Sequence, residues 1–270
     1  MKNPYLGHLR TRPKCSQHAL EKFQEAANTM ISSTQSLSLS PWEVVTSALA
    51  RSATPAQNWI RAATFVLPMA FLAVVLLQPW AEPKWMFLDP LTAAELSGDC
   101  CHTYYGFVSN LGIMAWSATA AVCLFAALLM AIQRRAGHLV WFAASAGLLT
   151  GWLALDDAFL VHEVVFPSFG IPQNAVLGLY LVLGGLYGLA SWRTIFQHDW
   201  FMLGVAGSAL ALSMMVDTVF HSLVPSLVYL EDSAKFFGIC CWASFHISTM
   251  AALLTQPAAS LDRRAWLKEG

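Results

Sequence analysis

Acidic, imidazole and ammonium side chains occur close together at three places in this otherwise apolar chain. They are Asp156, Asp157, His162 and Glu163, then Asp217 and His221, and finally Glu231 and Lys235. Ionisable groups in or beside a membrane helix are costly and are normally kept for a partner or a task. Carboxylates and imidazoles together are typical of metal ligands and of acid–base groups. These segments therefore predict one site built from several helices.

Metal-assisted chemistry fits these residue types. A catalytic zinc ion takes about three His, Asp or Glu ligands and a water, whereas calcium or magnesium would use the oxygens of the same acids. We expect a divalent metal, with zinc favoured, that activates water. The predicted metal ligands are His162, Asp217, His221, Asp157 and Glu231. In the predicted catalytic set, Glu163 or Asp156 is the base, and Lys235 with Ser109 or Asn110 stabilises developing negative charge.

Spacing along the helices limits which of these groups can meet. Asp217 and His221 are four residues apart, so they share one face of a helix. Asp156 and Glu163 are seven apart, which places them on one face of their helix, whereas Asp157 and His162 are expected to point elsewhere. Adjacent acids cannot all ionise without a cation, so a metal, a lysine or a bound proton must accompany them.

The elements that carry these groups are predicted to be membrane helices. The chain is 57% hydrophobic and 11% charged, against roughly 25% charged residues in soluble domains. A net charge of -1 leaves no basic surface for nucleic acid. Six stretches have the roughly 20 apolar residues that a bilayer requires: 62–80, 106–132, 138–162, 174–196, 200–222 and 230–255. The sequence predicts an all-α, polytopic membrane bundle of about six transmembrane helices.

Lysine and arginine in the connecting segments predict that both termini are cytoplasmic, because positive loops favour that side. On one side of the six spans lie Arg51, Arg61, Arg134, Arg135, Arg193, Arg263, Arg264 and Lys268. The opposite loops hold only Lys84. All three polar segments then lie at the outer ends of their helices, and this shared depth predicts a site. In a bacterium the protein would reside in the inner membrane with the site on the periplasmic side.

The flanking segments are predicted to be less ordered. Residues 1–60 are polar and expected to be largely disordered, except for a short amphipathic helix near 41–50 capped by Ser40 and Glu43. Residues 61–256 form the transmembrane bundle, and residues 257–270 form a cytoplasmic tail.

Two residues and a glycine pair within the predicted spans are interpreted as packing features. Gly184 and Gly188 are four residues apart, which favours close contact with another helix. Gly238 would allow another backbone to approach the last helix. His246, deeper on that helix, is interpreted as a hydrogen-bonded packing residue.

The chain resembles two known families. The patterns DDxFxxHE at 156–163 and EDxxKxxGxxxW at 231–242 resemble a bacterial family of multi-pass membrane proteins whose activity is uncharacterised. A looser similarity is to the alkaline-ceramidase and progestin-receptor-like membrane hydrolases, and it implies a metal site that hydrolyses lipid bonds within a helical bundle. The positions that match by residue type are Ser109, Asp156 or Asp157, His162 and His221. The chain departs from those hydrolases in having six predicted helices and no His-x-x-x-His in the last one.

Three functions are compatible with this pattern. The first is a metal-dependent hydrolase that acts on a lipid or another amphiphile. The second is a proton- or cation-coupled transporter or sensor, because intramembrane acids with a lysine partner also form proton relays. The third is a structural membrane subunit with a satisfied polar network. The expected partners are membrane lipids and an amphiphilic substrate, and nucleic acid is not expected.

Overall fold

The computed structural model describes residues 40–99, 102–220 and 228–255. The chain divides into two compact units, Met1–Leu49 and Ala50–Gly270. In the first, helix α2 (Pro41–Ala50) begins with the predicted capping box. The Ser40 hydroxyl accepts from the Glu43 N–H at 3.3 Å, and the Glu43 carboxylate accepts from the Ser40 N–H at 2.7 Å. The predicted disordered segment up to residue 39 and the predicted tail lie outside the described residues.

Six helices among the described residues are long and apolar enough to cross a membrane. They are α3 (Pro55–Leu77), α6 (Phe107–Ile132), α7 (Gly137–Phe159), α9 (Gln173–Gln197), α10 (Trp200–Met215) and α11 (Val228–Thr255). No strand occurs in the described part of the chain, and the predicted all-α multi-pass membrane fold is confirmed. Helix α3 begins at Pro55, inside the segment predicted to be disordered, because Thr54 and Gln57 form a capping box at its start.

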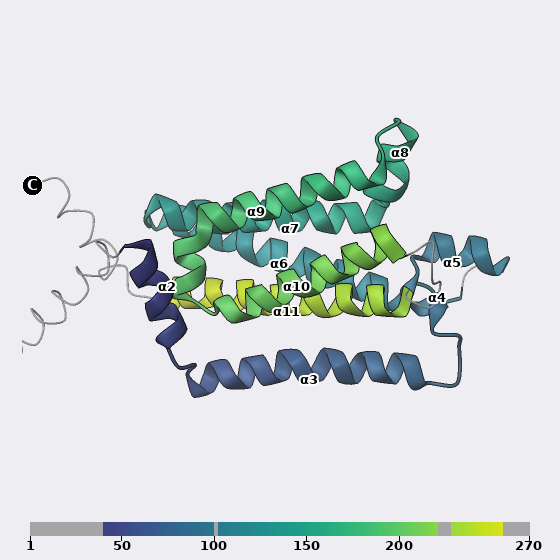
Figure 1. Cartoon of the computed structure of the whole chain (residues 1–270), viewed down its shortest axis with the longest axis horizontal. Helices are drawn as coiled ribbons and strands as arrows, with labels where there is room; N and C mark the ends of the chain where they lie inside the picture. Colours follow the sequence, from purple (N-terminus) through teal and green to yellow (C-terminus); the bar gives the residue numbers. More distant parts are fainter. Residues whose placement is uncertain (1–39, 100–101, 221–227, 256–270) are drawn as a thin grey trace, which may run out of the picture. The chain divides into compact units, whose positions relative to one another are not determined.

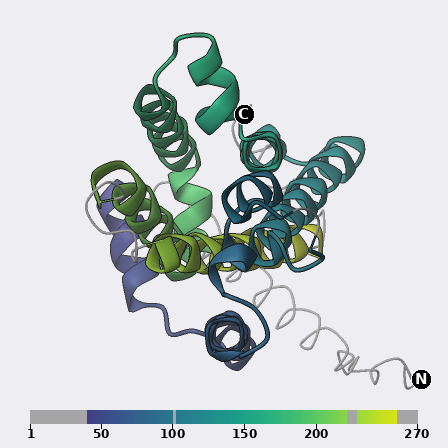
Figure 2. The ribbon, with the colours of Figure 1, turned by 90° about the vertical axis from the view of Figure 1, so that its right-hand side faces the viewer.

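Helix α11 lies among the other helices of the second unit (Figures 1 and 2). It packs against α10, α6 and α3, while α6 packs along α7. Glycines permit the closest approaches. A Cβ added at Gly238 would lie 2.9 Å from Leu210 Cγ of α10, and one at Gly147 would lie 2.7 Å from Leu124 Cγ of α6. The predicted role of Gly238 in close helix approach is therefore confirmed.

Polar contacts join helix α3 to the bundle near its own N-terminal end. The Arg61 guanidinium donates to both oxygens of Asp199, at 2.9 and 2.6 Å. Arg61 also lies over the Phe201 ring, 5.2 Å from its centroid. One turn further on, the Thr64 hydroxyl donates to Ser244 of α11 at 2.8 Å. Arg61 therefore joins two helices in addition to its predicted role in orienting the chain.

Short helices gather at the other end of the bundle, where α7 and α10 end and α11 begins (Figure 1). They are α4 (Lys84–Phe87), α5 (Pro90–Ser97) and α8 (Phe166–Ser168). At this end α10 continues into a π-helical turn, η2 (Val216–Phe220), and a second such turn, η1 (Val161–Val165), follows α7. We call this end of the second unit the site end.

The prediction of one continuous helix over residues 138–162 is wrong. Helix α7 ends at Phe159, and Leu160 adopts the left-handed conformation with φ 50° and ψ 43°. The Asp156 carboxylate accepts a hydrogen bond from the backbone N–H of His162 at 2.9 Å. Because a buried N–H must find an acceptor where the helical ladder stops, this side chain supports the break that changes the direction of the chain.

Candidate functional site

A cavity of about 360 Å³ lies between α7, α9, α10 and α11 and reaches the site end. Its charged lining residues are Asp156, Asp157, His162, Glu163, Asp217, Glu231 and Lys235. The structure thus brings together seven of the ten residues predicted to carry chemistry. Of the other three, Ser109 lies elsewhere in the bundle, as described below. Asn110 of α6 is exposed and is not among the lining residues, and His221 is outside the described residues.

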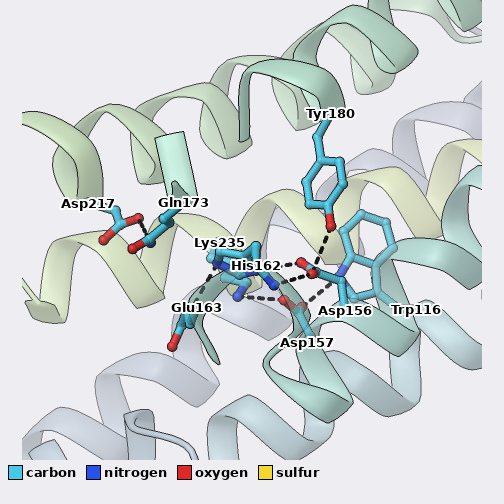
Figure 3. Close-up of polar contacts among 9 residues, drawn as sticks. All are labelled: Trp116, Asp156, Asp157, His162, Glu163, Gln173, Tyr180, Asp217 and Lys235. Atoms are coloured by element: carbon cyan, nitrogen blue, oxygen red, sulfur yellow. Dashed lines mark hydrogen bonds and ion pairs between the residues drawn. The ribbon is translucent and has the colours of Figure 1, made fainter. Parts of the chain in front are cut away.

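His162 lies between two carboxylates (Figure 3). Its Nδ1 is 2.6 Å from Oδ2 of Asp156, and its Nε2 is 3.3 Å from Oε1 of Glu163. Asp156, only 3% exposed, also accepts the Tyr180 hydroxyl at 2.8 Å. Because both ring nitrogens face carboxylate oxygens, both carry protons and the ring is an imidazolium. The prediction that His162 points away from the acids is wrong, because the turn at Leu160 directs it back toward Asp156.

This arrangement predicts a specific dependence of stability on pH. Burial alone would lower the pKa of His162, but hydrogen bonds with Asp156 and Glu163, and their charges, raise the pKa to about 9. An unfolded histidine has a pKa of about 6.5. The charged ring therefore stabilises the fold fully below about pH 6.5, and that contribution is lost as the pH rises through about 9. We expect the unfolding midpoints of wild type and His162→Gln to differ most near pH 6 and to converge above about pH 9.

Comparing the two proteins at each pH cancels the titration of groups that they share. Histidine ¹⁵N NMR would give the pKa directly, since His162→Gln identifies the missing signal among the eight histidines. A signal that titrates near the unperturbed value of about 6.5 would contradict a charged His162 ring held between Asp156 and Glu163.

A second charge pair joins three helices. Lys235 Nζ of α11 lies 2.8 Å from Oδ1 of Asp157 on α7. Trp116 of α6 donates its indole N–H to Oδ2 of the same carboxylate at 3.2 Å. Lys235 therefore neutralises an aspartate of the third membrane span, and a lysine was one of the three cations that the adjacent acids were predicted to require.

A small chamber of about 30 Å³ lies beside this ion pair. Asp157 and Lys235 line both the chamber and the main cavity, whereas Ser109 and Asp232 line the chamber. A space of this size can hold one water molecule. Ser109 is therefore close to Lys235, as predicted, but it is not among the residues that line the main cavity.

Several hydrogen-bonding residues of the site were not predicted from the sequence. Gln173, at the start of α9, donates to Oδ2 of Asp217 in η2 at 3.0 Å (Figure 3). Trp116 and Tyr180 donate to the two adjacent aspartates. With 11 tryptophans and 6 tyrosines in the chain, residue type alone gave no signal for these two. Gln173 could have been noticed as an amide at the edge of an apolar span.

Polar contacts continue more deeply along α11. Trp242, which lines the cavity, donates its indole N–H to Thr150 at 2.9 Å. His246, fully buried beyond the middle of α11, has Nδ1 2.9 Å from the Trp242 carbonyl and Nε2 2.8 Å from the Tyr187 hydroxyl. Nδ1 must donate to the carbonyl, so Nε2 accepts from the tyrosine. Both nitrogens are satisfied, which confirms the interpretation of His246 as a hydrogen-bonded packing residue.

The predicted metal ligands do not form a metal-binding group within the part of the chain that the structure describes. No cluster of three or more His, Cys, Asp or Glu side chains there is arranged to hold a metal ion. Both ring nitrogens of His162 face carboxylates, and Asp217 accepts from Gln173. A zinc site would therefore depend on His221, which is outside the described residues, and it stays a prediction.

The glycines of α9 have a different role from the predicted one. A Cβ added at Gly184 or Gly188 would meet no atom within 4 Å, so the predicted close helix contact at these positions is wrong. Both residues instead line the cavity, together with Gly185 and with Gly207 of α10. A small-residue spacing leaves room beside a helix, and here that room is open space rather than a neighbouring backbone.

A family model described as a domain of unknown function (DUF8692) matches residues 59–249. The chain belongs to the DUF8692 family. All charged residues that line the cavity fall inside the matched range, so the site is part of the DUF8692 domain. No curated protein and no solved structure matches the chain. The expectation of an uncharacterised family is confirmed, while the similarity to alkaline ceramidases and the bacterial origin stay predictions.

Proposed function

We propose that this DUF8692 protein is a proton- or cation-coupled transporter or sensor, with its site end facing away from the cytoplasm. The observation that carries the proposal is the charge balance of the cavity. Its described lining contains five carboxylates but only two basic side chains, His162 and Lys235. Carboxylates crowded around a cavity of low dielectric constant are stabilised by binding protons or a cation.

The cavity itself favours a functional site over a purely structural network. Protein interiors are close-packed, with few voids larger than a water molecule. The cavity in this protein has a volume of about 360 Å³. The fixed pairs at its rim, Asp156 with His162 and Asp157 with Lys235, give the cavity a rigid charged wall.

The depth of the polar groups supports transport more than hydrolysis. The cavity lining continues along α11 from Glu231 and Lys235 to Trp242, at the middle of the helix, where the indole N–H donates to Thr150. Transporters bind their substrate and coupling ions near the membrane midplane. A hydrolase needs a nucleophile or an activated water against its substrate, and Ser109, the predicted stabiliser of developing negative charge, lines the separate small chamber.

Proton release on cation binding tests the proposal. The protein in lipid nanodiscs, with a pH-indicator dye, would be titrated with sodium chloride and with tetramethylammonium chloride, neither of which carries an exchangeable proton. We expect at least one of these cations to displace protons from the carboxylates. In proteoliposomes with entrapped dye, the same addition outside should raise the internal pH if the protein is a transporter, whereas a sensor would leave it unchanged.

A pair of matched variants assigns the released protons to the cavity. Glu231→Gln removes one cavity carboxylate and should reduce the release. Glu95→Gln is the same substitution on α5, on an exposed residue that is not in the cavity lining, and should leave the release unchanged. If neither cation releases protons from the wild-type protein, or if Glu231→Gln leaves the release unchanged, the proposal is wrong.

A further inference from the structure

The cavity has two chemically different regions. The charged side chains gather near the site end, whereas the remaining wall is formed largely by apolar residues. Among these are Leu149, Leu153, Leu177, Leu203 and Leu210. An inorganic ion or a proton would use only the charged region. The apolar region is open space that a ligand with a hydrocarbon part would fill favourably.

Aromatic side chains also contribute to the cavity wall. Trp116, Tyr187 and Trp242 all line it, and the Trp116 and Trp242 rings meet edge to face with centroids 5.9 Å apart. Trp116 is also bonded to the Asp157 carboxylate, so aromatic rings and charge occur side by side. Aromatic rings beside carboxylates are a favourable environment for an organic ammonium ion.

The cavity is also accessible from the side, between α9 and α10. Leu181 of α9 lines the cavity and is nevertheless 58% exposed. Gly185 of α9 and Gly207 of α10 are likewise both exposed and part of the lining. These residues lie within helices that are apolar enough to cross a membrane, so the exposed side faces lipid. A hydrocarbon chain can enter through such an opening without leaving the bilayer.

The sign of the ligand charge follows from the two fixed charge groups. Lys235 and Asp157 neutralise one another. His162 is shared by two carboxylates, Asp156 and Glu163, which leaves this group with a net negative charge. An anionic head group would meet that charge in a site of low dielectric constant, which is unfavourable.

We infer that the ligand is an organic ammonium ion with a single slender hydrocarbon tail. The inference rests on the proposed function and specifies its substrate class. The head group lies among the carboxylates, and the tail occupies the apolar region beside the glycines of α9. One water molecule takes about 30 Å³ of liquid volume, so the cavity volume of about 360 Å³ corresponds to roughly twelve groups of that size. Octyltrimethylammonium has this size and is the probe of choice.

Chain length and charge can be tested on the unaltered protein. Calorimetric binding to protein-containing nanodiscs, corrected with empty nanodiscs for partition into lipid, would compare octyltrimethylammonium, tetramethylammonium and octyl sulfate. We expect octyltrimethylammonium to bind at least about tenfold more tightly than tetramethylammonium, because the tail is buried. Octyl sulfate should show no saturable binding beyond that of the empty nanodiscs.

Two glycine variants of α9 test the position of the tail. Gly184→Leu places a branched side chain in the cavity, and Gly178→Leu is the control, because both glycines have open space at the Cβ position but only Gly184 lines the cavity. Gly184→Leu should reduce the affinity for octyltrimethylammonium at least about tenfold. Gly178→Leu should leave that affinity and the proton release unchanged.

The outcomes separate this inference from the function on which it rests. Equal affinity for the two ammonium ions, or equally tight binding of octyl sulfate, would overturn the substrate class even if protons are still released by cations. Loss of octyltrimethylammonium binding in both leucine variants would place the tail elsewhere and count against the inference. Absence of proton release with every cation would instead overturn the proposed function.

Discussion

The variant Lys235→Met is expected to lose about 3 kcal/mol of unfolding free energy. Its partner Asp157 has an 11% exposed side chain and would lose the ammonium group that lies 2.8 Å away. The Lys235 side chain is itself 36% exposed toward the cavity, so water screens the pair and the cost falls at the low end of the range for buried pairs. Unfolding in mixed micelles with increasing SDS at pH 7 would measure the loss.

A double variant separates the lost charge from lost packing. Asp157→Asn combined with Lys235→Met removes both charges, and the asparagine oxygen can still accept from the Trp116 indole, now 3.2 Å from the carboxylate. Replacing both members of a buried pair is far less costly than removing one. We therefore expect the double variant to regain most of the stability. A double variant no more stable than Lys235→Met would show that the ion pair is not the cause.

The variant Asp156→Asn is expected to lose about 2 to 3 kcal/mol at pH 7, the cost of a hydrogen bond to a charged group. The carboxylate accepts from the His162 backbone, the His162 ring and the Tyr180 hydroxyl. An asparagine offers one oxygen and cannot serve all three donors. With its main counter-charge removed, the pKa of His162 should fall from about 9 toward the ordinary value. Unfolding free energy and histidine NMR would measure the two effects.

Tyr180→Phe is the matched control for this variant. It removes one neutral donor to Asp156 and leaves both contacts with His162 in place. The expected cost is about 1 kcal/mol, with the pKa of His162 still high. If Tyr180→Phe lowered that pKa as much as Asp156→Asn does, the carboxylate would not be the group that holds the proton on the ring.

Much of the architecture could be predicted from composition and position along the chain. Long apolar stretches locate membrane helices because a bilayer excludes unpaired backbone groups. The alternation of spans places the ends of α7 and α10 and the start of α11 together, which is why Asp156, Asp217 and Lys235 line one cavity. Helix boundaries were less certain, as the early start of α3 at Pro55 shows.

The partners of each side chain could not be predicted in the same way. An ideal helix places His162 away from Asp156, but the left-handed Leu160 turns the chain and brings the ring to 2.6 Å from the carboxylate. That break depends on a hydrogen bond between residues six apart, which no helical periodicity encodes. Likewise, nothing in the spacing of Gly184 and Gly188 distinguishes a helix contact from a cavity wall.

The hydrophobic length of each span was enough to predict a membrane protein whose charged groups share one depth. The contacts of the individual side chains came from the folded structure, in which Lys235 meets Asp157, His162 is held between two carboxylates, and a cavity separates α9 from α10. These depend on the rotation of each helix and on local breaks, and packing between helices determines both.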